Sequence, residues 1–236
     1  MMKTKWILIL VAILIGVLAI LFVVFRGISL TNGRTRQVIA YIRQPESKTS
    51  LVIPAGTRCG DAPFMMPSTG MIGFIWGDSF RVGHQHTGID IFPGTESGKT
   101  PIYTAYDGYL TRMADWKSSV ILRIPADPLN LDRQIWTYYT HMADSAGRSY
   151  IVEEFPPGTQ EVFVPAGTLL GYVGNYSGTS GNPTGVHLHF SIVKDDGKGM
   201  FLNELAIDNT LDPSPYFGLA LNAADNRDKI PLCNDF

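Results

Sequence analysis

After residue 60, apolar residues come in short runs that glycine and proline repeatedly interrupt. Such runs, rich in β-branched and aromatic residues, are typical of strands, and they lie at residues 102–110, 120–124, 135–139, 161–164, 169–173 and 186–193. Between them, Asp107-Gly108 and Pro165-Ala166-Gly167 are turn signals. The 24 glycines and 15 prolines of the chain agree with this pattern. We therefore predict a mainly β fold.

One apolar run near the N-terminus is much longer than the others. Residues 6–25 contain no charge and no proline, and a helix of this length matches the roughly 30 Å hydrocarbon core of a bilayer. No small-residue cleavage pattern follows, which favours an uncleaved transmembrane anchor over a cleaved signal peptide. Basic residues flank the run on both sides, so charge does not decide its orientation. The short stub before it, residues 1–5, favours export of the large C-terminal part.

The remaining chain divides by composition into a polar connector, a glycine-rich domain and a tail. The connector covers residues 26–60, and residues 37–42 within it could form a short strand or a helical turn. The domain covers residues 61–198. Residues 199–236 form a tail that we expect to be rich in loops, since its Asp-Pro-Ser-Pro sequence opposes helix formation. We also expect this tail to pack on the domain.

Charge and cysteine content narrow the function classes. The formal net charge is −2 and there is no basic stripe, so nucleic-acid binding is not predicted. The two cysteines, Cys59 and Cys233, are not in a CxxC spacing, so a cysteine zinc site is not indicated. In an exported domain they could form a disulfide, and the alternative is two unpaired thiols.

The histidines suggest a metal site. In the sequence His86-Thr87-Gly88-Ile89-Asp90, strand alternation would place His86 and Asp90 on one face, with Gly88 leaving room for an ion or a substrate. In Val186-His187-Leu188-His189, the two imidazoles would share a face. Each motif alone could be ordinary polar surface. Together, on neighbouring strands, they would bring three or four zinc ligands to one point.

These motifs occur within a set of blocks that resembles the lysostaphin/LytM-type peptidoglycan endopeptidases. The blocks follow the order of that family and cover about residues 64–194; they are residues 67–92, 101–110, 139–142, 165–174 and 185–190. The combination of HxxxD, an intermediate histidine and HLHF is specific to this family. The resemblance implies a small antiparallel β-sheet or sandwich domain with a groove.

The resemblance also implies residue roles. His86, Asp90 and His189 would bind one Zn²⁺ per chain, while His141 and His187 would line the open coordination position, take a proton from the attacking water and stabilise the oxyanion. These roles fit general chemistry, since zinc polarises a carbonyl and imidazoles exchange protons near neutral pH. Tyr139 could contact substrate, with packing as an equal alternative. His84 is expected to be a loop residue near the groove.

The predicted function is therefore hydrolysis of peptide bonds in peptidoglycan stems or cross-bridges, by a single-pass membrane protein whose catalytic domain is extracytoplasmic. One alternative is a catalytically silent relative that activates a cell-wall amidase, which predicts missing ligands. Another is a glycan- or peptide-binding module with a structural zinc, which predicts a site closed by four protein ligands. The connector before residue 60 could also cover the groove and inhibit it.

Overall fold

The computed structural model describes residue 6 and residues 13–18, 33–79 and 83–233. Its helices and strands are α2 (Gly33–Arg43), η1 (Pro45–Leu51), β1 (Met71–Phe74), β2 (Ile89–Phe92), β3 (Pro101–Tyr103), β4 (Gly108–Thr111), β5 (Val120–Ile124), β6 (Ile135–Thr140), β7 (Val162–Val164), β8 (Leu169–Tyr172), β9 (Leu188–Lys194), η2 (Ile207–Asn209), β10 (Thr210–Leu211) and α3 (Ser214–Phe217).

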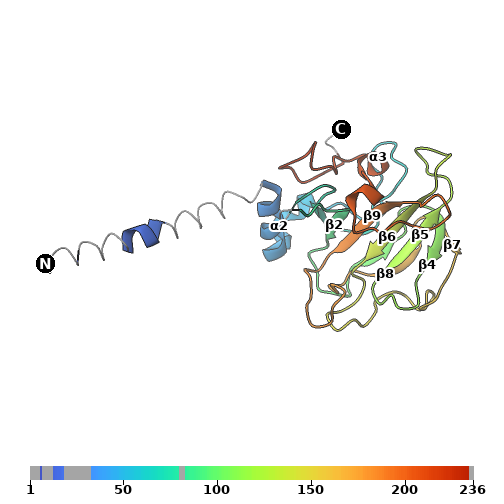
Figure 1. The fold of residues 1–236 in the computed structure, drawn as a ribbon, viewed down its shortest axis with the longest axis horizontal. Helices are drawn as coiled ribbons and strands as arrows, with labels where there is room; N and C mark the ends of the chain where they lie inside the picture. Colours follow the sequence, from blue (N-terminus) through green and yellow to red (C-terminus); the bar gives the residue numbers. More distant parts are fainter. Residues whose placement is uncertain (1–5, 7–12, 19–32, 80–82, 234–236) are drawn as a thin grey trace.

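An 8-stranded antiparallel sheet dominates the fold (Figure 1). Its order is β1-β2-β9-β6-β5-β4-β7, and β10 joins it by pairing with β9. Strands β3 and β8 form a separate two-stranded sheet. The mainly β, antiparallel fold predicted from the sequence is confirmed. Its longest strand, β9, lies between β2 and β6, so residues on three neighbouring strands can converge.

Alternation along β9 separates a core face from a polar face. Leu188, Phe190 and Ile192 are fully buried in the main hydrophobic core. The intervening His189 and Ser191 point to the other face, because successive side chains of a strand alternate. The neighbouring strand β2 follows the same rule, since its isoleucines 89 and 91 also lie in the core. The predicted separation of apolar and polar faces is therefore confirmed.

Most predicted strands match observed ones, but the run 102–110 does not form one strand. It divides into β3, which pairs with β8, and β4, which belongs to the large sheet. The chain bends at Thr104, whose N–H donates to Thr168 O and whose carbonyl accepts from Gly167 N. These hydrogen bonds to the predicted Pro-Ala-Gly turn take Thr104 out of strand pairing, and the chain crosses to the other sheet.

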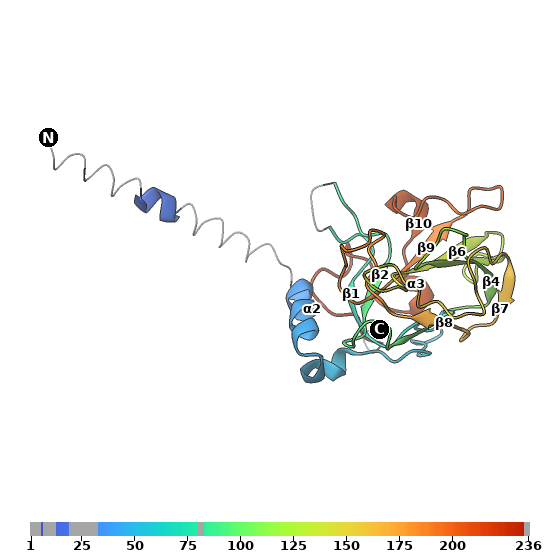
Figure 2. The same cartoon turned by 90° about the horizontal axis from the view of Figure 1, so that it is seen from below.

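The predicted connector contains helix α2, which packs on β1. Its buried residues Arg34, Val38 and Tyr41 recur at helical spacing, so they line one face. Val38 and Tyr41 form a small core with Met71 and Phe92. Helix α2 lies beside β1, at the edge of the sheet (Figure 2). The residues 37–42 are thus helical, and the boundary between connector and domain stays a prediction.

A buried ion pair ties α2 to the chain before β2. The guanidinium of Arg34, 1% exposed, donates to the Asp78 carboxylate and to Asn226 O. The other oxygen of Asp78 accepts from Ile75 N at 2.8 Å, and its backbone carbonyl accepts from His86 N at 2.7 Å. This ion pair therefore fixes the turn that holds His86.

The C-terminal segment completes the domain. A disulfide joins Cys59 to Cys233, so the pairing left open by the sequence is present. Aromatic residues of α3, Tyr216 and Phe217, lie in the main core against Phe64. Residues 199–236 therefore supply core side chains, in addition to loops. The expectation that the Asp-Pro-Ser-Pro sequence opposes a helix is wrong, because Pro213 and Pro215 lie at the N-terminus of α3, where proline is tolerated.

The predicted transmembrane anchor lies mostly outside the described residues. Within it, Trp6 and residues 13–18 are helical. Among the residues that the structure describes, no helix is long and apolar enough to cross a membrane.

We expect Arg34→Met to lower the free energy of unfolding by about 3–5 kcal/mol, because Asp78 would remain buried without its cation. Urea unfolding of the full chain in detergent, followed by tryptophan fluorescence, measures this. The matched control Arg43→Met changes an exposed arginine at the other end of the same helix and should cost no more than about 0.5 kcal/mol. Equal losses in the two variants would contradict the role given to the buried pair.

Candidate metal centre

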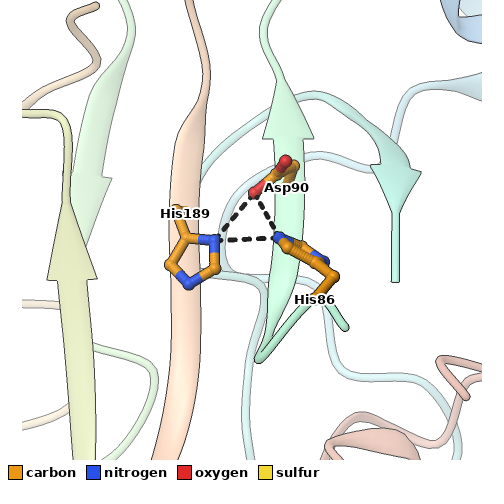
Figure 3. Close-up of side chains that lie close together, drawn as sticks. All are labelled: His86, Asp90 and His189. Carbon is orange, nitrogen blue, oxygen red and sulfur yellow. Dashed lines mark hydrogen bonds and ion pairs between the residues drawn. The ribbon is translucent and has the colours of Figure 1, made fainter. Parts of the chain in front are cut away.

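Three side chains converge on one point at the polar face of the sheet (Figure 3). The Nε2 atom of His86 lies 3.1 Å from Asp90 Oδ1 and 3.0 Å from His189 Nδ1, and the last two atoms are 2.9 Å apart. All three residues are buried, at 6–8% exposure. In the described part of the chain, this is the group of His, Cys, Asp and Glu residues with metal-ligand spacing.

Strand register brings Asp90 and His189 together. They are direct partners across the antiparallel pair β2–β9, so their side chains lie on the same face. His86 precedes β2 and reaches the site from a loop, contrary to the prediction that it belongs to the strand. Gly88 has a different role from the predicted one. A Cβ atom there would lie 2.1 Å from Phe190 O, so glycine lets this loop approach the backbone of β9.

Hydrogen bonds outside the triangle orient both imidazoles. His86 Nδ1 lies 3.1 Å from Ile75 O, which can only accept, so Nδ1 donates and Nε2 keeps its lone pair toward Asp90. His189 Nε2 lies 2.8 Å from Glu204 Oε1 and donates to it. Such outer acceptors fix the tautomer and the ring orientation of metal-binding histidines.

The triangle attracts positive charge. Burial opposes ionisation of Asp90, but His86, His187 and the hydrogen bond from His189 hold the pKa of its carboxyl well below its usual range. Burial also opposes a charge on His189, but its hydrogen bonds to Asp90 and Glu204 raise its pKa to about 10. The centre therefore favours a cation, either a proton on His189 or a metal ion.

The donor set fits zinc. Ligand distances of about 2.0–2.1 Å in a tetrahedron correspond to donor–donor edges of about 3.3 Å. The three observed edges of 2.9–3.1 Å are close to that value. Two imidazole nitrogens and one carboxylate oxygen are also the donors that catalytic zinc sites use, and three protein ligands leave a fourth position open.

His141 and His187 lie beside the triangle. His187 precedes β9 and its Nε2 is 3.6 Å from Asp90 Oδ1, while the ring of His141 is 4.5 Å from that of His187 between centroids. Nδ1 of His141 donates to Tyr176 O at 2.7 Å, and Nδ1 of His187 donates to Gly185 O at 2.8 Å, so both rings are held in place. In both residues, Nε2 remains to exchange a proton.

The environment keeps these two imidazoles neutral. Burial and the nearby His187 and His189 lower the pKa of His141 to about 3. Burial likewise lowers the pKa of His187, although the negative charge of Asp90 opposes this shift. At neutral pH both rings are therefore unprotonated at Nε2.

A cavity of about 330 Å³ opens over the site. It is lined by His84, Gln85, His86, Thr87, Ser118, Ser119, Tyr138, Thr140, His141, Tyr176, Ser177, Gly178, His189, Glu204 and Leu205. The loop position of His84 near the groove is thereby confirmed. Tyr138, Ser119 and Thr140 form a hydrogen-bonded wall, with Tyr138 Oη donating to Ser119 Oγ at 2.9 Å.

Tyr139 does not face this cavity. Its side chain is fully buried against Phe190, and its hydroxyl accepts from Ala105 N at 2.9 Å, so the packing alternative describes it and the suggested substrate contact does not. The suggestion assumed regular alternation up to His141. The strand ends at Thr140, and His141 has φ of 73°, which breaks the alternation.

Glu204 was missed from the sequence. It lies in the predicted tail, outside every block of the resemblance, and nothing in its spacing relates it to His189. Its pKa is lowered to about 2, since hydrogen bonds from His189, Thr87 and Ser191 and the charge of His189 outweigh the effect of burial. Only the folded chain brings this carboxylate to the site.

No protein-family model matches the chain, and no match is found among curated proteins. Similar solved structures include a candidate glycyl-glycine endopeptidase lytM from Ruminococcus gnavus, 25% identical with a TM-score of 0.35, which covers 55% of this chain and 44% of that chain. Lysostaphin is 20% identical with a TM-score of 0.40, covering 62% and 49%. The catalytic domain of a variant M23 protein EnpA, prophage-encoded in Enterococcus faecalis, is 23% identical with a TM-score of 0.36, covering 63% and 95%.

The chain spans about half the length of the first two of these proteins.

Zinc binding should weaken as the pH falls from 8 to 5, by up to about tenfold per pH unit, because the ion must displace the proton that His189 retains. Calorimetric titration of the full chain in two buffers of different ionisation enthalpy should show release of about one proton per ion. Asp90→Asn, which keeps the shape and removes the charge, should bind less tightly at every pH. Affinity that is independent of pH would contradict displacement of this proton.

Proposed function

We propose that the protein is a zinc-dependent endopeptidase that hydrolyses peptide bonds of peptidoglycan stem peptides or cross-bridges. The observation that supports this most directly is the triangle of His86, Asp90 and His189 with two further histidines beside it. These five residues occupy the positions that the motif resemblance assigns to ligands and catalytic groups. A zinc site that served structure alone would have four protein ligands, and this donor set has three.

His86, Asp90 and His189 would hold the metal. When bound, Zn²⁺ acts as a Lewis acid that polarises the scissile carbonyl and lowers the pKa of water. The burial of the three ligands limits water at the site, which strengthens electrostatic interactions there.

The two remaining histidines would handle the proton and the developing charge. With Nδ1 fixed to a backbone carbonyl, each ring presents Nε2 as its exchangeable nitrogen. A neutral His187 or His141 can take a proton from the attacking water and later give it to the leaving amine. Negative charge on the carbonyl oxygen would favour the protonated ring, because a nearby anion raises the pKa of an imidazole. Phe92, stacked on His187 with ring centroids 5.2 Å apart, keeps that ring in place.

Two cavities could accommodate an extended peptide. The polar cavity contains His86, His141 and His189. A second cavity of about 320 Å³ is lined by Asp90, His187, Phe92, Ile42 and other residues, and is mostly apolar. Helix α2 therefore borders the site through Ile42. Inhibition by the predicted connector stays a hypothesis, because the same segment carries the buried Arg34 and Tyr41 and its removal would also disturb the fold.

The complete ligand set favours the enzyme over the silent regulator, since the regulator reading predicts missing ligands. Peptidoglycan is accordingly the proposed partner.

The location proposed for the catalytic domain is the extracytoplasmic side of the cell membrane, with residues 6–25 as a single-pass anchor. The apolar run supports the anchor, and the Cys59–Cys233 disulfide supports an oxidising compartment. Protease digestion of intact and lysed cells tests this, because an exported domain is cleaved in both.

His187→Ala should keep about one zinc per chain and reduce peptidoglycan lysis by about 10²–10⁴-fold, since a positioned general base contributes that much. Zinc content and turbidity loss of purified peptidoglycan measure the two effects. The control is Gln160→Ala, which changes an exposed polar residue outside the polar cavity and should resemble the wild type.

Zinc without lysis in either protein would favour the amidase-activating regulator. A wild-type chain that binds no zinc would overturn the metal site and the proposed function with it.

A further inference from the structure

The carboxylate of Glu204 reaches the metal site from a segment that folds back along β9. Leu202 N donates to Lys194 O at 3.0 Å, at the end of β9, and β10 pairs antiparallel with the same strand through Thr210 and Val193. Both ends of the segment 202–210 are thus attached to β9. Glu204 lies between these attachments, where its side chain faces His189.

One oxygen of Glu204 accepts three hydrogen bonds from two parts of the fold. Oε1 accepts from His189 Nε2 at 2.8 Å, from Thr87 Oγ1 at 2.7 Å and from Ser191 Oγ at 3.2 Å. The side chain is 15% exposed and that of His189 is 11% exposed, so little water competes for these bonds. Thr87 belongs to the loop before β2, while the other two donors lie on β9.

We propose that Glu204 is a positioning residue for the metal centre. It holds the proton of His189 on Nε2 and so presents Nδ1 to the position between His86 and Asp90. Through Thr87 it also holds the loop that carries His86, the adjacent residue. The inference rests on the proposed function, because it assigns Glu204 a role toward the metal that the three ligands would bind.

The charge balance of the site agrees with this role. Asp90 and Glu204 supply two negative charges on opposite sides of the His189 ring. These balance a doubly charged ion, and a carboxylate bonded to a metal-binding histidine makes the imidazole a better donor. With Glu204 absent, the buried Nε2–H would lose its acceptor, and His189 could turn or change tautomer.

Replacement of Glu204 tests the proposal through metal affinity. In competition with a chromophoric chelator, the full chain in detergent should bind Zn²⁺ about 10–100-fold less tightly after Glu204→Gln or Glu204→Ala, which is the usual effect of losing such a partner. Glu96→Gln changes an exposed glutamate and should bind like the wild type. At limiting zinc the Glu204 variants should also lose lysis, and excess zinc should restore it.

Two further measurements separate positioning from a general structural role. The metal-free variants should stay folded, with only a modest fall in melting temperature, because a lost hydrogen-bond acceptor costs about 1–3 kcal/mol. In the zinc-loaded wild type, ¹⁵N NMR should show His189 protonated at Nε2, with a slowly exchanging proton whose exchange quickens in Glu204→Ala.

Unchanged zinc affinity in both Glu204 variants would overturn the inference and leave the proposed function intact. Affinity lost together with a large fall in the metal-free melting temperature would also overturn it, since the effect would then be on folding. A wild-type chain without zinc affinity would overturn both proposals at once.

Discussion

The pairing of β2 with β9 is the constraint on which the site depends. It places Asp90 directly opposite His189, and the apolar residues on either side of each point into the core. If either strand slipped by one residue, its polar side chain would turn toward the core and its apolar side chains toward the groove, at a large cost in free energy. The hydrophobic core therefore sets the register, and the register sets two of the three donors. The pairing of β9 with β6 extends the same arrangement to Thr140, which is opposite His189 on the other side.

The third donor is held by different means. His86 lies on a loop, so its position depends on a glycine and on hydrogen bonds. Gly88 allows the loop to approach the Phe190 carbonyl, and the backbone and ring of His86 bond to the turn 75–78. The buried Asp78 and its partner Arg34 fix that turn. A metal site with one ligand on a loop remains precise only if such bonds restrict the loop.

Much of this arrangement could be predicted from the sequence, because the information is local. Alternation in Leu188-His189-Phe190 is enough to assign the two faces of a strand, and it identified the polar face correctly. The alternation fails where the backbone leaves the strand, and the sequence does not show where that happens. The positive φ of His141 is one such point. Because of it, Tyr138 lines the cavity, whereas regular alternation would have placed Tyr139 there. The bend at Thr104, which divides one predicted strand into two, is another.

The features that escaped prediction share a physical cause, which is contact between residues far apart in the sequence. Arg34 meets Asp78 and Glu204 meets His189 because the chain before and after residues 61–198 packs against it. A fragment limited to 61–198 would contain Asp78 and His189 without these partners. A buried carboxylate without its guanidinium and an imidazole N–H without its acceptor each cost free energy, and both lie next to the metal ligands. The motifs contain the ligands, but the rigidity that zinc chemistry requires comes in part from the flanking segments.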